Sequence, residues 1–164
     1  MDAAQRDKWL ILEDSVFLRD CRLDLFHASG HGGQKVNKSS TAVRLTHLPS
    51  GVSASCQESR SQTENRGRAL KRLRLALAFS IRSETSEPPS LENIPSERNQ
   101  EYPRYVAALL DALEKALWDL KASAQIFGIS PSKLAKILYR DPDVWQEVQR
   151  QRAGRGLAPL NAPK

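Results

Sequence analysis

Gly32, Gly33 and Gln34 are the residues whose types and spacing point most clearly to chemistry. Adjacent glycines have no Cβ and tolerate φ > 0, so the backbone N–H groups can approach a crowded anionic group such as a phosphate or an ester. Gln34 adds an uncharged amide that both donates and accepts hydrogen bonds. Such a loop is suited to placing a water molecule and stabilising an oxyanion, so we take these three residues as candidate catalytic residues.

Short extended segments are predicted on both sides of this loop, which we place at residues 28–40. Alternating polarity predicts strands at 22–26 and 41–47, and a Pro-Ser-Gly turn predicts a return strand at 52–57. A long helix is expected over 61–81, with an apolar stripe and arginines over the rest. A leader with a short helix around 9–19 precedes these elements. The pattern predicts an α+β fold in which a small sheet and a packed basic helix hold a glycine-rich catalytic loop.

The second half of the chain has a different pattern. Residues 83–100 are acidic, rich in proline and without periodicity, which is typical of a linker. Apolar spacing then predicts an amphipathic helix over 102–120 that continues or restarts until Gly128. Ser130-Pro131 and Asp141-Pro142 predict the starts of two more helices. We therefore expect an N-terminal leader at 1–19, a catalytic domain at 20–82, a linker at 83–100 and a small all-α domain at 101–164.

The excess positive charge lies in the half of the chain that contains the loop. Residues 1–82 hold 14 Lys and Arg against 8 Asp and Glu, whereas residues 83–164 hold 11 of each. A basic surface attracts polyanions through counterion release, so RNA is the expected partner. A helix-turn-helix pattern, with Lys133, Lys136 and Arg140 on its second helix, is the competing indication of DNA binding. Its half of the chain has no net charge, so we favour a simple helical bundle there.

The composition argues against several other classes of site. Cys21 and Cys56 are the two cysteines, too few for a disulfide framework or a zinc site. The longest apolar runs are only a few residues, and we recognise no signal peptide. We therefore expect no metal or organic cofactor, no membrane association, and a monomer in a reducing compartment, either the cytoplasm or an organelle matrix.

Five blocks of the sequence resemble, in order and spacing, the catalytic domain of class I peptide chain release factors. The blocks are Gly32-Gly33-Gln34, Val36-Asn37-Lys38, residues 41–47, residues 49–52 and Arg60-Ser61-Gln62. Gly-Gly-Gln alone would carry little weight, but a match over five consecutive blocks is very improbable by chance. The resemblance covers residues 20–82, about half of the chain.

The resemblance implies a reaction. In that family the loop enters the peptidyl-transferase centre of the large ribosomal subunit, where the glutamine helps water to cleave the ester between peptide and tRNA. Gln34 would then position the water and the developing oxyanion, through its backbone N–H as much as its side chain, and Gly32 and Gly33 would let the loop fit. A general-base role for His27 or His31, which lie beside the loop, is the alternative that we rank lower.

Residues around the loop are expected to contact RNA. Lysines and arginines would bind phosphates, and uncharged amides would brace the loop or bind RNA, so these contacts supply affinity and little sequence specificity. The predicted RNA-binding residues are Lys35, Asn37, Lys38, Arg44, Arg60, Gln62 and Arg66. The other cations of the predicted helix could equally form a solvated face. We expect His47, Trp118 and Trp145 to be structural.

The sequence thus predicts codon-independent hydrolysis of peptidyl-tRNA on the ribosome or on detached large subunits. The 164 residues leave no room for the stop-codon-reading domains of a class I release factor, so ribosome rescue is expected rather than codon decoding. Members of the family are often methylated on this glutamine, which makes a methyltransferase acting on Gln34 a candidate partner. The alternatives are a non-catalytic ribosome- or RNA-binding module and, less favoured, a DNA-binding helix-turn-helix regulator.

Overall fold

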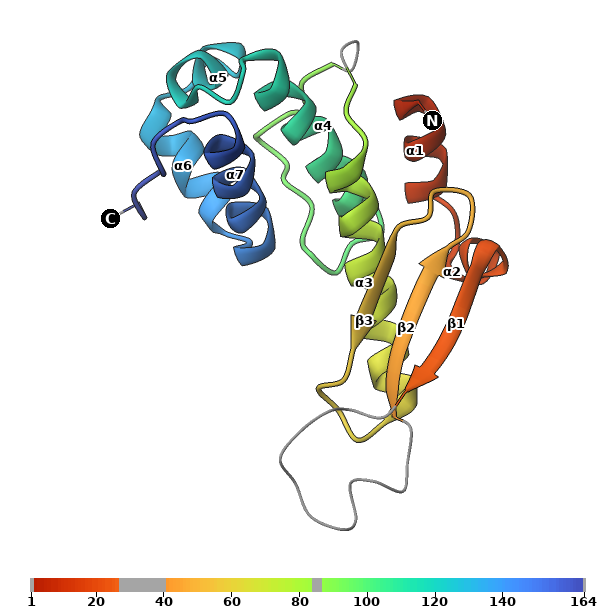
Figure 1. Cartoon of the computed structure of the whole chain (residues 1–164). Coiled ribbons are helices and arrows are strands. Elements are labelled where there is room, and N and C mark those ends of the chain that lie inside the picture. The colour runs from red at the N-terminus through yellow and green to blue at the C-terminus, as the bar shows by residue number, and fades with distance from the viewer. Residues whose placement is uncertain (1, 27–40, 84–86, 164) are drawn as a thin grey trace. The chain divides into compact units, whose positions relative to one another are not determined.

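The computed structural model describes residues 2–26, 41–83 and 87–163, and its chain divides into two compact units near Ile81 (Figure 1). The first unit has a three-stranded sheet and the second is all helical, so the predicted α+β class is confirmed. The strands are β1 (Cys21–Phe26), β2 (Ala42–His47) and β3 (Ser53–Cys56), and the helices of the first unit are α1 (Ala3–Leu10), α2 (Asp14–Phe17) and α3 (Gln62–Ser80). The second unit contains α4 (Tyr102–Lys115), α5 (Leu120–Ile126), α6 (Pro131–Tyr139) and α7 (Pro142–Gly154).

The sheet has the antiparallel order β1-β2-β3, and its three strands lie where the alternating pattern predicted them. Leu25 pairs with Val43, and the β1–β2 ladder ends at the pair of Phe26 and Ala42. Val43 and Leu45 are buried on one face of β2, whereas Arg44 is exposed on the other, because successive side chains of a strand point to opposite faces. The candidate catalytic loop therefore leaves one strand and enters its direct neighbour.

Helix α3 packs against β2 and β3 and supplies the core of the first unit. Its start is fixed by Ser61, whose Oγ accepts a hydrogen bond from the backbone N–H of Glu64. Ala69, Leu73 and Leu77 are fully buried and follow one another at intervals of four residues, so they form a single apolar stripe. The expected helix over 61–81 is thus present, beginning one residue later and ending one residue earlier.

The N-terminal segment differs from its prediction. The helix expected around residues 9–19 is wrong, since α1 ends at Leu10 and the short α2 and a 3-10 turn (Leu18–Asp20) follow. Arg74 of α3 explains the break, because its guanidinium donates hydrogen bonds to the carbonyl oxygens of Leu10 (2.9 Å) and Leu12 (2.6 Å). These carbonyls are held by a side chain from another element, so they are not satisfied by a continuing helix.

The second unit contains a sharp corner that the sequence did not predict. The helix expected over 102–120 ends at Lys115, because Leu117 and Trp118 adopt left-handed backbone conformations with φ of 51° and 61°. The corner carries Trp118 into the core, where its side chain is buried as expected. Arg152 of α7 closes the corner by donating a hydrogen bond to the carbonyl oxygen of Trp118. Gly128 has a φ of 62° and ends α5, as its position predicted.

Candidate functional site

The base of the loop is the part of the candidate site that the structure describes. Gly32, Gly33, Gln34, Lys35, Asn37 and Lys38 lie outside the described residues, as do His27 and His31. Phe26, the last residue of β1, and Thr41, which directly precedes β2, flank this segment. The residues that contact and surround those two ends form the described part of the site.

Asn65 is the residue that organises the base of the loop. Its side chain is fully buried, and its Nδ2 donates hydrogen bonds to the carbonyl oxygens of Thr41 (2.8 Å) and Ser59 (2.7 Å). Its Oδ1 accepts from the backbone N–H of Ser59 (2.9 Å) and from the thiol of Cys56 (3.4 Å). Donor and acceptor capacity are both used, as a buried amide requires. One side chain thus joins the loop end, the end of β3 and the first turn of α3.

The sequence analysis did not identify Asn65 as a functional residue, although its position in an apolar stripe is unusual for a polar side chain. Asn65 lies four residues before Ala69 and in phase with Leu73 and Leu77, so it occupies the apolar stripe of α3. A polar residue at a core position must find hydrogen-bond partners, and in a first helical turn the nearest are loop carbonyls. The pattern therefore indicates that Asn65 binds a loop, but only the fold shows which strand end it binds.

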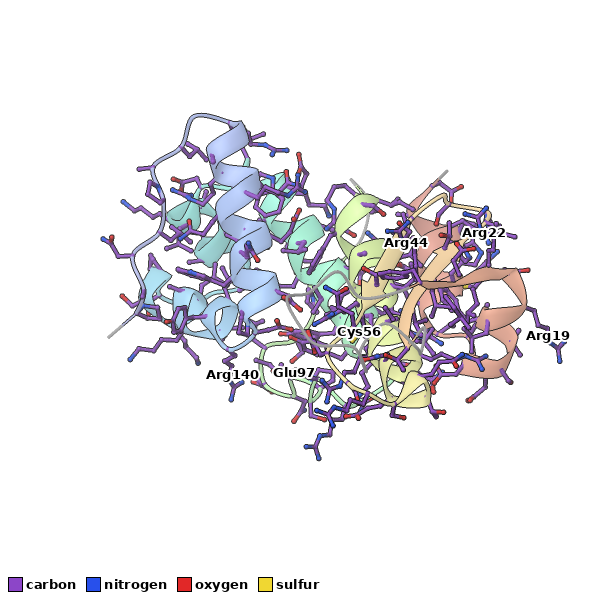
Figure 2. The ribbon with its side chains drawn as sticks, turned by 60° about the horizontal axis from the view of Figure 1, so that its bottom comes forward. Arg19, Arg22, Arg44, Cys56, Glu97 and Arg140 are labelled. Carbon is purple, nitrogen blue, oxygen red and sulfur yellow. The ribbon has the colours of Figure 1, made fainter. Side chains whose placement is uncertain are left out.

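Arg44 lies beside the same end of the sheet. It is exposed on β2 (Figure 2). Its guanidinium stands over the ring of Phe26 at 5.4 Å from the ring centroid. Arg44 also faces Asp24 across the β1–β2 ladder, and Asp24 forms an ion pair with Arg22 at 3.1 Å. The predicted RNA-binding residue Arg44 is thus solvent-facing and next to the residue at which the loop begins.

Arg60, Gln62 and Arg66 are gathered at the start of α3. All three are exposed, and Arg60 follows Ser59, which Asn65 ties to Thr41. Gln62 and Arg66 are four residues apart on the first turns of the helix, so they project from the same side. The fold therefore brings three of the predicted RNA-binding residues to the base of the loop.

The remaining arginines of α3 have internal partners. Arg68 forms ion pairs with Glu64 (2.5 Å) and Glu58 (3.0 Å), and Arg72 also pairs with Glu58. Hydrogen bonds from Arg72 and then Arg68 lower the pKa of the Glu58 carboxyl, and hydrogen bonds from Ser59 and Arg68 lower that of Glu64. These carboxylates compensate Arg68 and Arg72, whereas Arg66 near the helix start and Lys71 form no ion pair within the described residues.

Arg74 neither belongs to a solvated face of the helix nor is exposed for RNA binding. Its side chain is 5% exposed, bonds to backbone carbonyls and Asp14 (2.8 Å), and stands over the Phe17 ring at 4.5 Å. It is therefore a structural residue that joins the N-terminal segment to α3.

His47 lies at the far end of β2 from the loop and is structural, as expected. Its ring is fully buried, stacks on Phe17 at 5.0 Å and meets the edge of Trp9 at 4.6 Å. Its Nδ1 is 2.7 Å from the hydroxyl of Ser50 in the turn before β3. Burial lowers the pKa of His47, so the neutral imidazole is the form that packs in this core.

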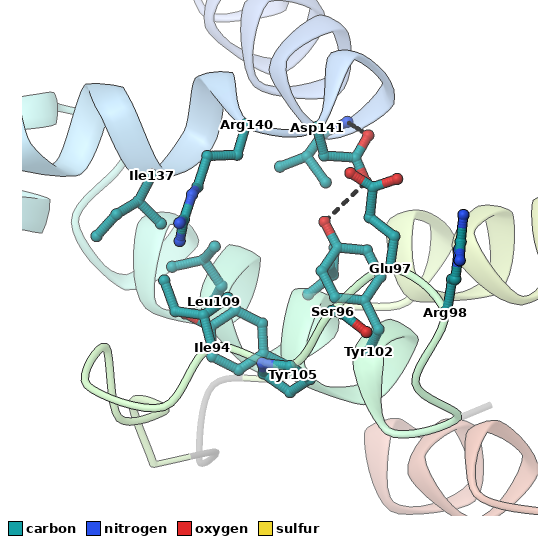
Figure 3. A pocket seen from close by; sticks show the side chains of 13 residues that line it. Ile94, Ser96, Glu97, Arg98, Tyr102, Tyr105, Leu109, Ile137, Arg140 and Asp141 are labelled. Atoms are coloured by element: carbon teal, nitrogen blue, oxygen red, sulfur yellow. Dashed lines mark hydrogen bonds between the residues drawn. The ribbon is translucent and has the colours of Figure 1, made fainter.

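A pocket of about 640 Å³ lies in the second unit, between residues 94–98 and the helices α4 and α6 (Figure 3). Tyr102 on its wall donates a hydrogen bond from its hydroxyl to Asp141 at 2.7 Å. Tyr105 is the other aromatic residue of the lining, and burial raises the pKa of its hydroxyl to about 12. Arg140 points toward the pocket from the end of α6.

The described ranges contain neither a metal-ligand cluster nor a helix suited to a membrane. No cluster of three His, Cys, Asp or Glu residues there could hold a metal ion. None of the helices in those ranges has both the length and the apolar character that crossing a bilayer requires.

The comparisons with known proteins agree with this geometry. The RF-1 domain model matches residues 13–104, more than half of the chain, and the chain belongs to this family, the domain of class I release factors that contains the Gly-Gly-Gln motif. Peptide chain release factor 1 of Syntrophus aciditrophicus is 52% identical over 66 residues, covering 40% of this chain and 18% of that protein. Peptide chain release factor 2 of Thermomicrobium roseum is 48% identical over 86 residues, covering 51% and 23%. The chain thus spans only about a fifth of the length of the curated relatives that it matches.

Proposed function

We propose that this protein hydrolyses the ester of peptidyl-tRNA on the ribosome without reading a stop codon. The observation that carries the proposal is the Gly32-Gly33-Gln34 motif between two paired strands of an RF-1 domain. Water attacks the ester carbonyl, and Gln34 orients the water while its backbone N–H stabilises the oxyanion. Removal of one preorganised donor of this kind costs about 10²–10³-fold in rate.

The residues at the base of the loop support binding to ribosomal RNA. Arg44, Arg60 and Arg66 are exposed around the end of the sheet where the loop begins and ends. They supply phosphate contacts, and Gln62 adds an uncharged hydrogen-bonding group. Lys35, Asn37 and Lys38, which belong to the same part of the sequence, complete the proposed RNA-binding set.

Codon independence is the finer part of the proposal. In its support, the family match is to the domain that contains the Gly-Gly-Gln motif, and a helical unit of four helices in the described range 87–163 accompanies it. We place the protein in ribosome rescue, where stalled complexes lack a stop codon. A methyltransferase that modifies Gln34 is an additional proposed partner, which mass spectrometry of the protein from its native cell would test.

The experiment uses ribosomes that carry labelled peptidyl-tRNA on an mRNA without a stop codon. Wild-type protein should release the peptide, and Gln34→Ala should lose at least about 100-fold of the rate. The matched control is Gln125→Ala, because Gln125 is an exposed glutamine on α5 far from the loop in sequence. If the wild-type protein and Gln34→Ala both bind the ribosome but neither releases the peptide, a non-catalytic module is favoured. Equal release by both proteins would exclude Gln34 as the catalytic residue.

A further inference from the structure

The second unit, residues 82–164, is nearly neutral, with 12 Lys and Arg against 11 Asp and Glu, but only some of its cations have partners within the unit. Most of its arginines are engaged inside the unit, either with carboxylates or with backbone carbonyls. Four arginine–carboxylate ion pairs are Arg82–Asp111 (3.2 Å), Arg104–Glu101 (3.6 Å), Arg150–Glu147 (2.6 Å) and Arg155–Glu114 (2.7 Å). Arg152 donates to the carbonyl oxygens of Trp118 and Ala158. These contacts neutralise charge within the unit, so the cations left over decide what it presents to a partner.

The cations left over are concentrated on α6. Lys133, Lys136 and Arg140 are all exposed, and their spacing of three and four residues puts them on one side of the helix, a set that we call the α6 cation stripe. No acidic residue lies between Pro131 and Arg140, and within the described residues none of the three forms an ion pair. Leu134 and Leu138 bury the opposite side, which fixes the stripe outward.

The pocket of the second unit adjoins this stripe. Arg140 belongs to both, since it ends α6 and also lines the pocket. Figure 3 shows Arg140 on one side of the opening and Glu97 on the other. Leu109 and Tyr105 contribute apolar surface between them. The stripe and the pocket therefore adjoin at Arg140, and the pocket wall combines apolar side chains with the carboxylates of Glu97 and Asp141.

Nucleotides in a single strand match this combination of groups. Phosphates pair with lysine and arginine, and a base offers flat apolar faces to tyrosine and leucine. The amino groups of adenine, guanine and cytosine can donate hydrogen bonds to a carboxylate such as Glu97. The volume of about 640 Å³ exceeds that of one base. A base in a duplex is stacked and paired, so only an unpaired nucleotide can enter.

We propose that the second unit binds a single-stranded segment of RNA, with its phosphates on the α6 cation stripe and one unstacked base in the pocket. This binding goes beyond the proposed hydrolysis and does not require Gln34. The helical unit thus has its own RNA-binding site, separate from the RNA contacts around the loop in the first unit.

The first test measures the affinity of the full-length chain for a labelled 12-nucleotide single-stranded RNA over a range of salt. Lys133→Gln, Lys136→Gln and Arg140→Gln together should lower affinity by about 10- to 100-fold at 0.1 M salt and reduce the log–log salt slope by about 2, because each phosphate contact contributes about 0.7. The control triple Arg104→Gln, Lys115→Gln and Lys121→Gln removes the same charge from the same unit. Equal losses in both triples would mean that only net charge matters and would overturn the site.

The second test locates the base. RNA that contains 4-thiouridine should crosslink to peptides from residues 94–105 and 131–141 in both wild-type protein and Gln34→Ala, whether or not the latter hydrolyses peptidyl-tRNA. Ser96→Trp places an indole at an exposed position of the pocket wall and should reduce affinity while leaving the salt slope unchanged. Crosslinks confined to residues 2–81 would overturn the proposal. Equal binding of duplex DNA, or of free adenosine monophosphate at the same concentration, would also overturn it.

Discussion

Asn65 on α3 donates a hydrogen bond to the carbonyl oxygen of Thr41 at 2.8 Å, across 24 positions of the chain. Thr41 directly precedes β2 and follows the segment that contains the candidate catalytic residues. The same amide holds Ser59 through two further bonds, so the helix start and the loop end share one anchor. The position of the loop end is therefore set by a buried residue that makes no contribution to the surface.

Replacing Asn65 by Asp should impair release beyond its effect on stability. The substitution keeps the Oδ1 acceptor of the bonds from Cys56 and Ser59. It removes the Nδ2 donor and sets a carboxylate against the carbonyl oxygens of Thr41 and Ser59. We expect a loss of about 2–4 kcal/mol in the free energy of unfolding. Peptide release, measured where the variant remains folded, should fall at least 10-fold with ribosome affinity nearly unchanged.

Asn99→Asp is the matched control for this variant. Asn99 is exposed and uses its Oδ1 as an acceptor from the backbone N–H of Glu101, which an aspartate retains. Stability and release should both stay close to wild type. Full release by folded Asn65→Asp would show that the anchor does not position the catalytic loop.

Replacing Arg74 by Leu should destabilise the first unit strongly. The change leaves the carbonyl oxygens of Leu10 and Leu12 without the donor that they now share. A polar group left unsatisfied costs about 1–3 kcal/mol, so the free energy of unfolding, measured by urea denaturation, should fall by about 2–5 kcal/mol. Lys71→Leu, at an exposed position of the same helix, should change the free energy of unfolding by less than about 0.5 kcal/mol. Similar losses in the two variants would contradict the structural role of Arg74.

The two tyrosines of the pocket should respond in opposite directions to the same change. The hydroxyl of Tyr105 is buried without a hydrogen-bond partner among the described residues, whereas that of Tyr102 donates to Asp141. Tyr105→Phe removes an unsatisfied polar group and should raise the free energy of unfolding by about 1 kcal/mol. Tyr102→Phe should lower it by about 1–3 kcal/mol, because hydrogen bonds to charged groups are stronger. Thermal denaturation of both variants measures the difference, and a destabilised Tyr105→Phe would refute this assignment.

Stability should fall with decreasing pH because of His47. Burial lowers its pKa in the folded state below the unfolded value of 6.5, so the unfolded chain binds the proton more readily. The stabilisation is fully present above pH 6.5 and is lost as the pH falls toward the folded pKa. Urea denaturation at several pH values should show a slope that approaches about 1.4 kcal/mol per pH unit below 6.5. In His47→Phe this component should vanish, and an unchanged pH profile would rule out His47 as its source.

Local patterns predicted the strands and α3 closely, because alternation, a serine cap and a leucine stripe act over a few residues. Of the candidate site residues, the fold brings Arg44, Arg60 and Arg66 to one end of the sheet, and their role in RNA binding stays a prediction. Asn65 and Arg74 were missed because their roles depend on partners 24 and more than 60 positions away. The left-handed pair Leu117 and Trp118 was missed for a related reason, since burial of the indole overrides local backbone preference.

The corner at Trp118 has a consequence for the order in which the protein is made. Its carbonyl is held by Arg152, and Arg152 in turn binds the carbonyl of Ala158 with its Nε and Nη2 groups at 3.0 and 2.8 Å. A left-handed pair of non-glycine residues is unfavourable alone. The contacts that hold it come from Arg152, which is synthesised 34 residues after Trp118. During translation α4 and α5 therefore emerge well before their junction can close. The helical unit completes its corner only when α7 and the residues after it have left the ribosome.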